Sequence, residues 1–477
     1  MKDLVNITIP TDLQQLISTD QAWHYSIVPK EIKNGTLFFY ADKENWTSEK
    51  MDELEMLLGE KVEVVLLDSE LLKQTLGKYY RKSRNPLNSS KAAQINSEDF
   101  IYQLISEANS IGSSDIHIES YVERCRIRLR IDGRLIERYV ISVSEYPALV
   151  NKLKIKANLD IAEKRLPQDG RISFNGGKDK IDIRISILPT LHGEKVVMRL
   201  LSKDATEIDI KKLGFSDRQL NDFLEGSKRS HGIVLLSGPT GSGKTTTLYA
   251  TLKILNDEKT NIVTIEDPIE YTLEGINQVQ LRENIGLTFS GALRSFLRQD
   301  PDVIMLGEIR DAETAQMAIR AALTGHLVLS TIHTNSAWGT ISRLVDMGVP
   351  SYLLASTMNI TAAQRLVRLL CEDCKETVDF DESLFPNSFD APRKLKSHCV
   401  PRGCGNCHYT GYIGRKAVYE IIPIDQELAG FIKENRFNIK EDIEKRNIEQ
   451  LMDNAFHLLE KGKTSVEEVY SMLMNSY

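Results

Sequence analysis

The chain lacks long apolar runs, an apolar leader and an excess of positive charge. No apolar stretch in its 477 residues approaches the roughly 20 residues that a membrane-spanning helix needs. The start, Met1 to Asn6, has no apolar segment of the kind found in signal peptides. With 60 Lys and Arg against 67 Asp and Glu, the net charge of −7 argues against a surface devoted to nucleic acid. We therefore expect a cytoplasmic protein that is not inserted in a membrane and does not bind nucleic acid directly.

Cysteine is also scarce, and four of the six cysteines are grouped. Cys371 and Cys374 form one C-x-x-C pair, and Cys404 and Cys407 form a second pair 29 residues further on. Two such pairs hold four thiolates around one Zn²⁺, which fits a reducing compartment better than two disulfides do. A redox role or a chance pattern is the alternative. The other two cysteines carry no motif: Cys125 and Cys399.

The length and the order of the segments predict a multidomain α/β protein. At about 100–200 residues per domain, the chain has room for two to four domains. Short strand-like and helix-like segments mix at the start, a polar stretch of linker composition follows, and apolar strands alternate with helices in the second half. The predicted divisions are a small αβ domain at 1–80, a linker at 81–97, an α+β domain at 98–212 and an α/β domain at 213–477.

One predicted strand carries a row of arginines. Residues 124–131 alternate strictly between arginine and apolar side chains and run into an Asp132-Gly133 turn, which predicts a hairpin. Such a row is usually a solvated face. The other interpretation is a domain that presents cations to an anion, and alternation alone does not decide between them.

The most specific motif is a glycine-rich loop between a predicted strand and a predicted helix. Residues 238–245 fit G-x-x-x-x-G-K-[ST] and follow the apolar block 232–237. Glycines let the backbone wrap a polyphosphate, Lys244 reaches its β- and γ-phosphates, and the Thr245 hydroxyl is a ligand of Mg²⁺. The alternative is a turn that fits by chance. The predicted phosphate-binding residues are Gly238, Pro239, Thr240, Gly241, Ser242, Gly243, Lys244, Thr245 and Thr246.

Three more apolar strands deliver polar residues at their carboxyl ends, where ligands of parallel sheets collect. Residues 261–270 end in three acids with Glu270 last, residues 300–308 end in Glu308, and residues 327–334 are flanked by His326 and His333. Hydrolysis of a nucleoside triphosphate needs a metal, a carboxylate that orients water and a cation. We assign Glu308 to the metal or its waters and Glu270 to water activation. Surface carboxylates and a structural histidine are the alternatives.

The combined motifs resemble the secretion ATPases of type II secretion systems and type IV pilus assembly, over roughly residues 98 to 477. The resemblance implies a RecA-like P-loop ATPase core, preceded by a PAS-like α+β domain and the small N-terminal αβ domain. It also implies a zinc-binding subdomain at 371–407 and a helical C-terminal segment at 408–477. The segments that carry it are the phosphate loop, residues 266–270, 307–311, 323–326 and 333–335, and the cysteine pairs.

The same resemblance implies roles for individual residues. Glu308 matches the Walker-type glutamate, Glu270 the proposed general base, and His326 and His333 the histidine box. Family members form hexameric rings in which the preceding domain lends arginines to the nucleotide. By motif these are Arg184 and Arg199, and they would act as arginine fingers. Two further arginines, four apart on one predicted helix face, would help at the subunit boundary: Arg294 and Arg298.

We therefore expect a homohexameric motor that hydrolyses ATP with Mg²⁺, carries Zn²⁺ and powers pseudopilus assembly in a type II secretion system. Residues 1–80 would bind the cytoplasmic part of an inner-membrane platform protein, which holds the motor at the membrane peripherally. Assembly of a type IV pilus or a competence pilus is the alternative. A rival of another class is a scaffold that assembles on binding ATP and turns it over negligibly.

Overall fold

A computed structural model describes residues 7, 9, 13, 16–17, 19–33, 36–80, 98–122, 124–176, 179–201, 208–385, 389 and 391–474. The chain divides into two compact units, one of residues 1–200, 370–376 and 400–413, the other of residues 201–369, 377–399 and 414–477. The predicted linker 81–97 lies outside the described residues, and the predicted domain boundaries stay predictions. Within the described ranges, no helix has both the length and the apolar character that crossing a bilayer demands.

The first unit begins with a three-stranded sheet and its helices. Strand β1 pairs antiparallel with β2, and β2 pairs parallel with β3. The parallel pair is possible because α3 connects the two strands, and its left-handed C-cap at Gly59 (φ 69°) ends that helix. The elements are α2 (Thr19–Tyr25), β1 (Ile27–Lys33), β2 (Thr36–Asp42), α3 (Ser48–Leu58), β3 (Lys61–Leu67) and α4 (Ser69–Tyr79).

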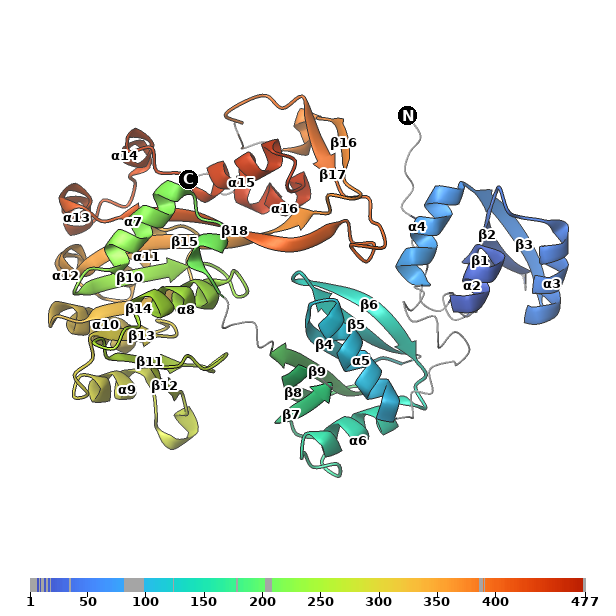
Figure 1. Ribbon diagram of the computed structural model, residues 1–477, viewed down its shortest axis with the longest axis horizontal. Coiled ribbons are helices and arrows are strands. Elements are labelled where there is room, and N and C mark those ends of the chain that lie inside the picture. Colours follow the sequence, from blue (N-terminus) through green and yellow to red (C-terminus); the bar gives the residue numbers. More distant parts are fainter. Residues whose placement is uncertain are drawn as a thin grey trace. The chain divides into compact units, whose positions relative to one another are not determined.

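A six-stranded sheet of order β6-β5-β4-β9-β8-β7 follows in the same unit. Two helices, α5 and α6, pack on its apolar face (Figure 1). Cys125 is buried in that core. The elements are α5 (Glu98–Ser110), β4 (Ser113–Ser120), β5 (Cys125–Ile131), β6 (Arg134–Ile141), α6 (Tyr146–Lys156), β7 (Gln168–Gly176), β8 (Asp179–Thr190) and β9 (Gly193–Leu201).

The arginine row lies on the other face of this sheet, and acids of β4 pair with it. Glu119 contacts Arg126 at 2.9 Å, Arg128 at 2.7 Å and Lys195 at 3.2 Å. Burial disfavours the ionised carboxyl, but the hydrogen bonds from these cations outweigh it and lower the pKa of Glu119 to about 2. The row is therefore an ion-paired face, an outcome that alternation along one strand does not reveal.

The second unit is built on a seven-stranded sheet of order β12-β11-β13-β14-β10-β15-β18. Its strands from β12 to β15 are parallel. Alternate residues of β10 enter two different cores, Ile233 one and Val234 the other, which is why the strand is an unbroken apolar run. Helices cover both faces (Figure 1), which confirms the predicted α/β class.

The elements of this sheet and its covering helices alternate along the chain. They are η2 (Ile210–Lys212), α7 (Asp217–Ser227), β10 (Gly232–Ser237), α8 (Lys244–Leu255), β11 (Ile262–Glu266), β12 (Asn277–Gln280), η3 (Glu283–Ile285), α9 (Phe289–Phe296), β13 (Val303–Leu306), α10 (Ala312–Leu323), β14 (Leu327–Ile332), α11 (Gly339–Asp346), α12 (Ser351–Thr357) and β15 (Met358–Leu370).

The C-terminal segment corrects one prediction, because residues 408–477 are not helical throughout. Strand β18 (Tyr412–Pro423) occupies an edge of the seven-stranded sheet, where residues 417–422 are buried. The apolar residues of this buried run enter two different cores in alternation, which is the pattern of a strand covered on both faces rather than helical spacing. The remaining elements are β16 (Glu376–Asp379), η4 (Glu382–Leu384), β17 (Ser397–Val400), α13 (Gln426–Lys433), α14 (Lys440–Lys445), α15 (Leu451–Glu460) and α16 (Val466–Leu473).

Candidate active site and metal centre

The glycine-rich segment joins the end of β10 to the start of α8. Gly238 has φ 149° and Gly243 has φ 88°, backbone angles that residues other than glycine rarely adopt. A Cβ on Gly238 would lie 2.5 Å from the carbonyl oxygen of Gln364, and one on Gly243 would lie 2.8 Å from the side-chain nitrogen of Gln364. Conformation and close approach therefore both require glycine at these positions.

Lys244 is buried at the first position of α8. Its Nζ donates to the carbonyl oxygens of Gly238 at 2.8 Å and Pro239 at 3.1 Å, so the ammonium lies inside the loop. Burial lowers the pKa of Lys244 to about 8, while the charge of Glu308 raises it and that of Arg365 lowers it. A bound anion would favour the charged ammonium, and the helix start adds its own attraction for phosphate.

The other loop residues differ in exposure. Pro239, Thr240, Gly241 and Thr245 are exposed, and Thr246 is half-buried. Ser242 is buried, and its Oγ finds no hydrogen-bond partner within the described part of the chain. The exposed Thr245 hydroxyl at the helix start is where a phosphate-bound Mg²⁺ would take a ligand.

Glu308 lies just beyond β13, the second strand from β10. Its carboxylate accepts a hydrogen bond from Arg310 at 2.5 Å and lies 3.4 Å from Nε2 of His333, which follows β14. Burial disfavours its ionised form, yet the contacts with Arg310 and His333 outweigh burial and lower the pKa of Glu308. The carboxyl group of Glu308 is therefore ionised at neutral pH, which is the form in which a carboxyl group binds a metal ion.

The acidic segment after β11 places its three acids in different environments. Glu266 is buried inside the strand, Asp267 is exposed and lies 3.7 Å from Arg310, and Glu270 is half-buried. Arg310 therefore lies between the acidic segment and Glu308. The roles proposed for Glu270 and Glu308 stay predictions. The structure places both acids beyond the carboxyl ends of parallel strands, on the side of the sheet where the phosphate loop follows β10.

The structure separates the two histidines, and it shows that one expectation about the arginines is wrong. His326 precedes β14 while His333 follows it, so they lie at opposite ends of a strand and roughly 20 Å apart. His326 contacts the carbonyl oxygen of Ala321 at 2.8 Å, away from the phosphate loop. Helix α9 ends at Phe296, so Arg298 lies beyond it and does not share a helix face with Arg294.

Arg310 and Arg365 are close to the site but had no predicted role. Arg365 of β15 donates to the carbonyl oxygens of Gln364 at 3.0 Å and Asn335 at 2.9 Å, and so borders the phosphate loop. Arg310 follows Glu308 by two residues, a spacing that could have pointed to it. No local signal marks Arg365, because β15 reaches the site only through sheet pairing.

Arg184 and Arg199 belong to the other unit, on the neighbouring strands β8 and β9. Nε of Arg199 lies 2.9 Å from Oδ1 of Asp115, which faces it across the β4–β9 pair. The Arg199 side chain remains 56% exposed, whereas that of Asp115 is 6% exposed. The aspartate thus anchors one edge of the guanidinium and leaves the rest accessible. Whether these arginines reach the nucleotide stays a prediction.

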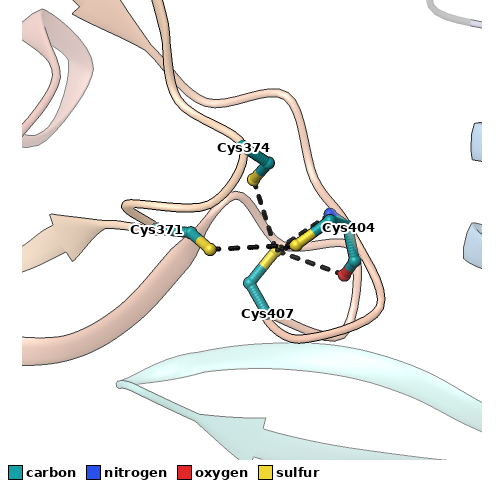
Figure 2. Close-up of side chains that lie close together, drawn as sticks. All are labelled: Cys371, Cys374, Cys404 and Cys407. Carbon is teal, nitrogen blue, oxygen red and sulfur yellow. Dashed lines mark hydrogen bonds between the residues drawn. The ribbon is translucent and has the colours of Figure 1, made fainter.

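The four paired cysteines come together although 29 residues separate the pairs. Their sulfur atoms all lie within 4.8 Å of one another. Figure 2 shows the four side chains gathered together, two from each turn. Cys371 and Cys404 are 3.8 Å apart, and Cys374 and Cys407 are 3.7 Å apart. Four sulfur atoms at about 2.3 Å from a central zinc would be separated by about 3.8 Å, so the spacing fits a tetrahedral site.

Backbone amides also point at the sulfur atoms. Gly403 donates to Cys374 at 3.3 Å, Cys404 donates to Cys407 at 3.1 Å, and Gly411 donates to Cys407 at 3.3 Å. Such donors stabilise thiolates, the form in which cysteine binds a metal. The cluster is therefore compatible with zinc on chemical grounds as well as on geometry.

The loop at the end of β10, its buried lysine and the acid beyond β13 define the class of the protein. It is a P-loop ATPase whose phosphate loop lies at the carboxyl end of a strand in a mainly parallel sheet. The chain belongs to the family of type II/IV secretion system proteins, whose model matches residues 90–471. A second model, the MshEN domain, matches residues 2–86.

Named relatives are similar over most of the chain. The type IV pilus assembly ATPase PilB of Myxococcus xanthus is 39% identical over 98% of this chain and 88% of that protein. The type II secretion system protein E of Pseudomonas aeruginosa is 48% identical over 77% of this chain and 74% of that protein. Among solved structures, the pilus retraction motor PilT with bound ADP matches with a TM-score of 0.52 and 27% identity, over 78% of this chain and 96% of PilT.

Proposed function

We propose that this ATPase is the motor that powers pseudopilus assembly and protein export in a type II secretion system. The observation that carries the proposal is the convergence of Lys244 and Glu308 at one sheet edge, with Glu270 on the adjacent strand end. The relatives named type II secretion system protein E supply the biological context, at 44% to 49% identity. The work is done as a homohexamer, held at the inner membrane through a platform protein that binds the N-terminal domain.

In this proposal each residue has a distinct task. Lys244 and the backbone of residues 238–243 bind the phosphates of ATP. Thr245 and Glu308 hold Mg²⁺, which supplies positive charge to the phosphates. Glu270 orients the attacking water and accepts its proton, while Arg184 and Arg199 stabilise the charge that develops on the γ-phosphoryl group. The four cysteines hold Zn²⁺ as a structural ion.

Type IV pilus assembly is the second candidate, and a specific observation favours it. The PilB relative matches 98% of the chain, including the N-terminal domain, whereas protein E of Pseudomonas aeruginosa matches 77%. Full-length protein should be tested for binding to cytoplasmic segments of a secretion platform and of a pilus platform from the same cell. Selective binding to the pilus platform would transfer the motor to that system.

The ATPase reading itself is tested with two substitutions. We expect Glu308→Gln to bind ATP normally but to lower kcat by about 10²-fold or more, because a carboxylate ligand is lost from the charged site. Lys244→Ala should lose ATP binding as well. Phosphate release and nucleotide affinity are measured on the same preparations. Turnover by the wild type that is as negligible as that of Glu308→Gln would favour the scaffold, and equal, substantial turnover by both would remove Glu308 from the proposed site.

A further inference from the structure

Glu266 is a buried carboxylate to which three neutral groups donate. It is 3% exposed at the end of β11. Oγ1 of Thr264 donates to it at 2.6 Å, Nε2 of Gln278 donates at 3.0 Å, and the hydroxyl of Tyr249 donates to its other oxygen. Burying a charged group costs free energy unless hydrogen bonds compensate. A carboxylate buried among three donors therefore indicates that Glu266 holds neighbouring side chains in place.

Tyr249 connects this carboxylate to the phosphate-binding helix. The side chain is fully buried, and it lies on α8, which begins at Lys244. Burial and the charge of Glu266 raise the pKa of Tyr249, so its hydroxyl keeps its proton and remains a donor. The same hydroxyl accepts a hydrogen bond from Nε2 of Gln278 at 3.4 Å, and this amide also donates to Glu266. One hydroxyl thus contacts both the buried acid and a side chain of β12.

Further side-chain hydrogen bonds hold the segment that carries Glu270 against β12. The N–H of Ile269 donates to Gln280 at 3.3 Å, and the N–H of Leu273 donates to Gln278 at 2.7 Å. The amide of Gln278 also donates to the carbonyl oxygen of Tyr271 at 3.2 Å. Gln278 therefore contacts Glu266 and the segment at the same time, which joins the two halves of the network.

We infer that Tyr249 and Glu266 are positioning residues that tie the phosphate-binding helix, through Gln278, to the segment that carries Glu270. The inference rests on the proposed role of Glu270 in activating water. Because α8 begins at the lysine that is proposed to bind phosphate, a movement of that helix is passed through these contacts to the segment that carries Glu270. The carboxylate is thus placed relative to the phosphates by side chains that touch neither substrate nor metal.

The test compares Tyr249→Phe and Glu266→Gln with the wild type. Phenylalanine keeps the ring and removes the hydroxyl, and glutamine keeps the shape and removes the charge. We expect each to lower kcat by about 10-fold or more with unchanged ATP affinity, since small misplacements of a catalytic group have effects of up to ~10². Tyr249→Phe serves as the test if Glu266→Gln fails to fold.

A second background separates positioning from general destabilisation. In a Glu270→Gln protein, adding either substitution should cause little further loss of kcat, because both act through the group already removed. Glu468→Gln is the matched control: it breaks the buried 2.6 Å contact with Arg368 in the same unit. This control should lower the melting temperature and leave kcat unchanged.

The outcomes distinguish the inference from the function on which it rests. Full additivity in the Glu270→Gln background, or unchanged kcat in Tyr249→Phe, overturns the positioning role alone. A Glu270→Gln protein with wild-type turnover overturns the assignment of the base and the inference with it. If the wild type does not hydrolyse ATP, the proposed function is overturned whatever the two substitutions show.

Discussion

At the scale of single residues, polar contacts within the protein hold the charged side chains that carry the proposed chemistry. Lys244 is desolvated inside its loop, Glu308 is drawn to Arg310 and His333, and Arg199 is anchored by Asp115. Each of these groups is charged yet at least partly withdrawn from water, where electrostatic interactions are stronger than at an exposed surface. The site residues are therefore oriented before any nucleotide arrives.

Glu119 gives a pH-dependent prediction at this scale. Its pKa is lowered to about 2 in the folded chain, so its contribution to stability is present above the unfolded pKa of about 4.3 and is lost as the pH falls toward 2. We expect Glu119→Gln to lower the free energy of unfolding by a few kcal/mol at pH 7, as removal of one partner from a buried network does.

Urea denaturation at a series of pH values measures this effect. The difference between wild type and Glu119→Gln should shrink steadily below about pH 4.3. Glu441→Gln is the control, because Glu441 pairs with Lys445 at 3.9 Å on the exposed surface and should change stability by less than about 1 kcal/mol. A difference that stays constant from pH 7 to pH 3 would show that Glu119 does not act through its charge.

Short segments between elements carry most of the chemistry at the next scale. The phosphate loop lies between β10 and α8, Glu308 follows β13, His333 follows β14 and the cysteine pairs lie on two separate turns. Parallel strands bring the first three to one edge of a sheet. The cysteine turns lie beside the neighbouring strands β15 and β18, with Cys371 directly after β15, and the N–H of Cys371 donates to the carbonyl oxygen of Gly411 at 2.9 Å.

We expect the wild type to contain about one Zn²⁺ per chain, and a Cys371→Ser/Cys404→Ser protein to contain none, because two thiolates cannot complete a tetrahedral site. Metal analysis of the purified proteins measures this directly, and limited proteolysis reports whether residues 372–407 become accessible. Cys125→Ser is the control, since Cys125 is buried in a different core and should leave the metal content unchanged. Equal zinc in the wild type and the double variant would rule out the four-cysteine site.

At the scale of the whole molecule, the residues to which we propose catalytic roles are divided between the two compact units. The phosphate loop and its acids belong to one unit, while Arg184 and Arg199 belong to the other. A motor needs such a division, because binding and release of nucleotide can then change the relation between two rigid parts. The proposed hexamer extends the same principle to neighbouring subunits.

Mixing wild-type chains with inactive Lys244→Ala chains tests the hexamer. If neighbouring subunits contribute to each site, activity per wild-type chain should fall as the share of inactive chains rises. An inert protein added at the same concentration controls for dilution and crowding. Activity that follows only the amount of wild-type chain would show that each subunit works alone.

Local motifs allowed much of the fold and site to be predicted. The strand–loop–helix at 232–255, the strand before Glu308 and the hairpin at Asp132-Gly133 are encoded within short windows, because apolar spacing and glycine conformations act locally. The strand β18 was missed, since its place at a sheet edge depends on pairing with the distant β15. The end of Arg294's helix before Arg298 was also missed, because helical spacing of two residues does not show where the helix stops.

The sequence by itself determined the reaction class, through the phosphate loop, the strand-end acids and the paired cysteines, because each requires particular residue types at fixed short spacings. Only the tertiary structure decided which of these groups meet. It paired the arginine row with Glu119, left His326 at the far edge, and buried Glu266 between Tyr249 and Gln278. The reason is that hydrogen bonds and ion pairs between distant strands depend on sheet order and register, which no local pattern records.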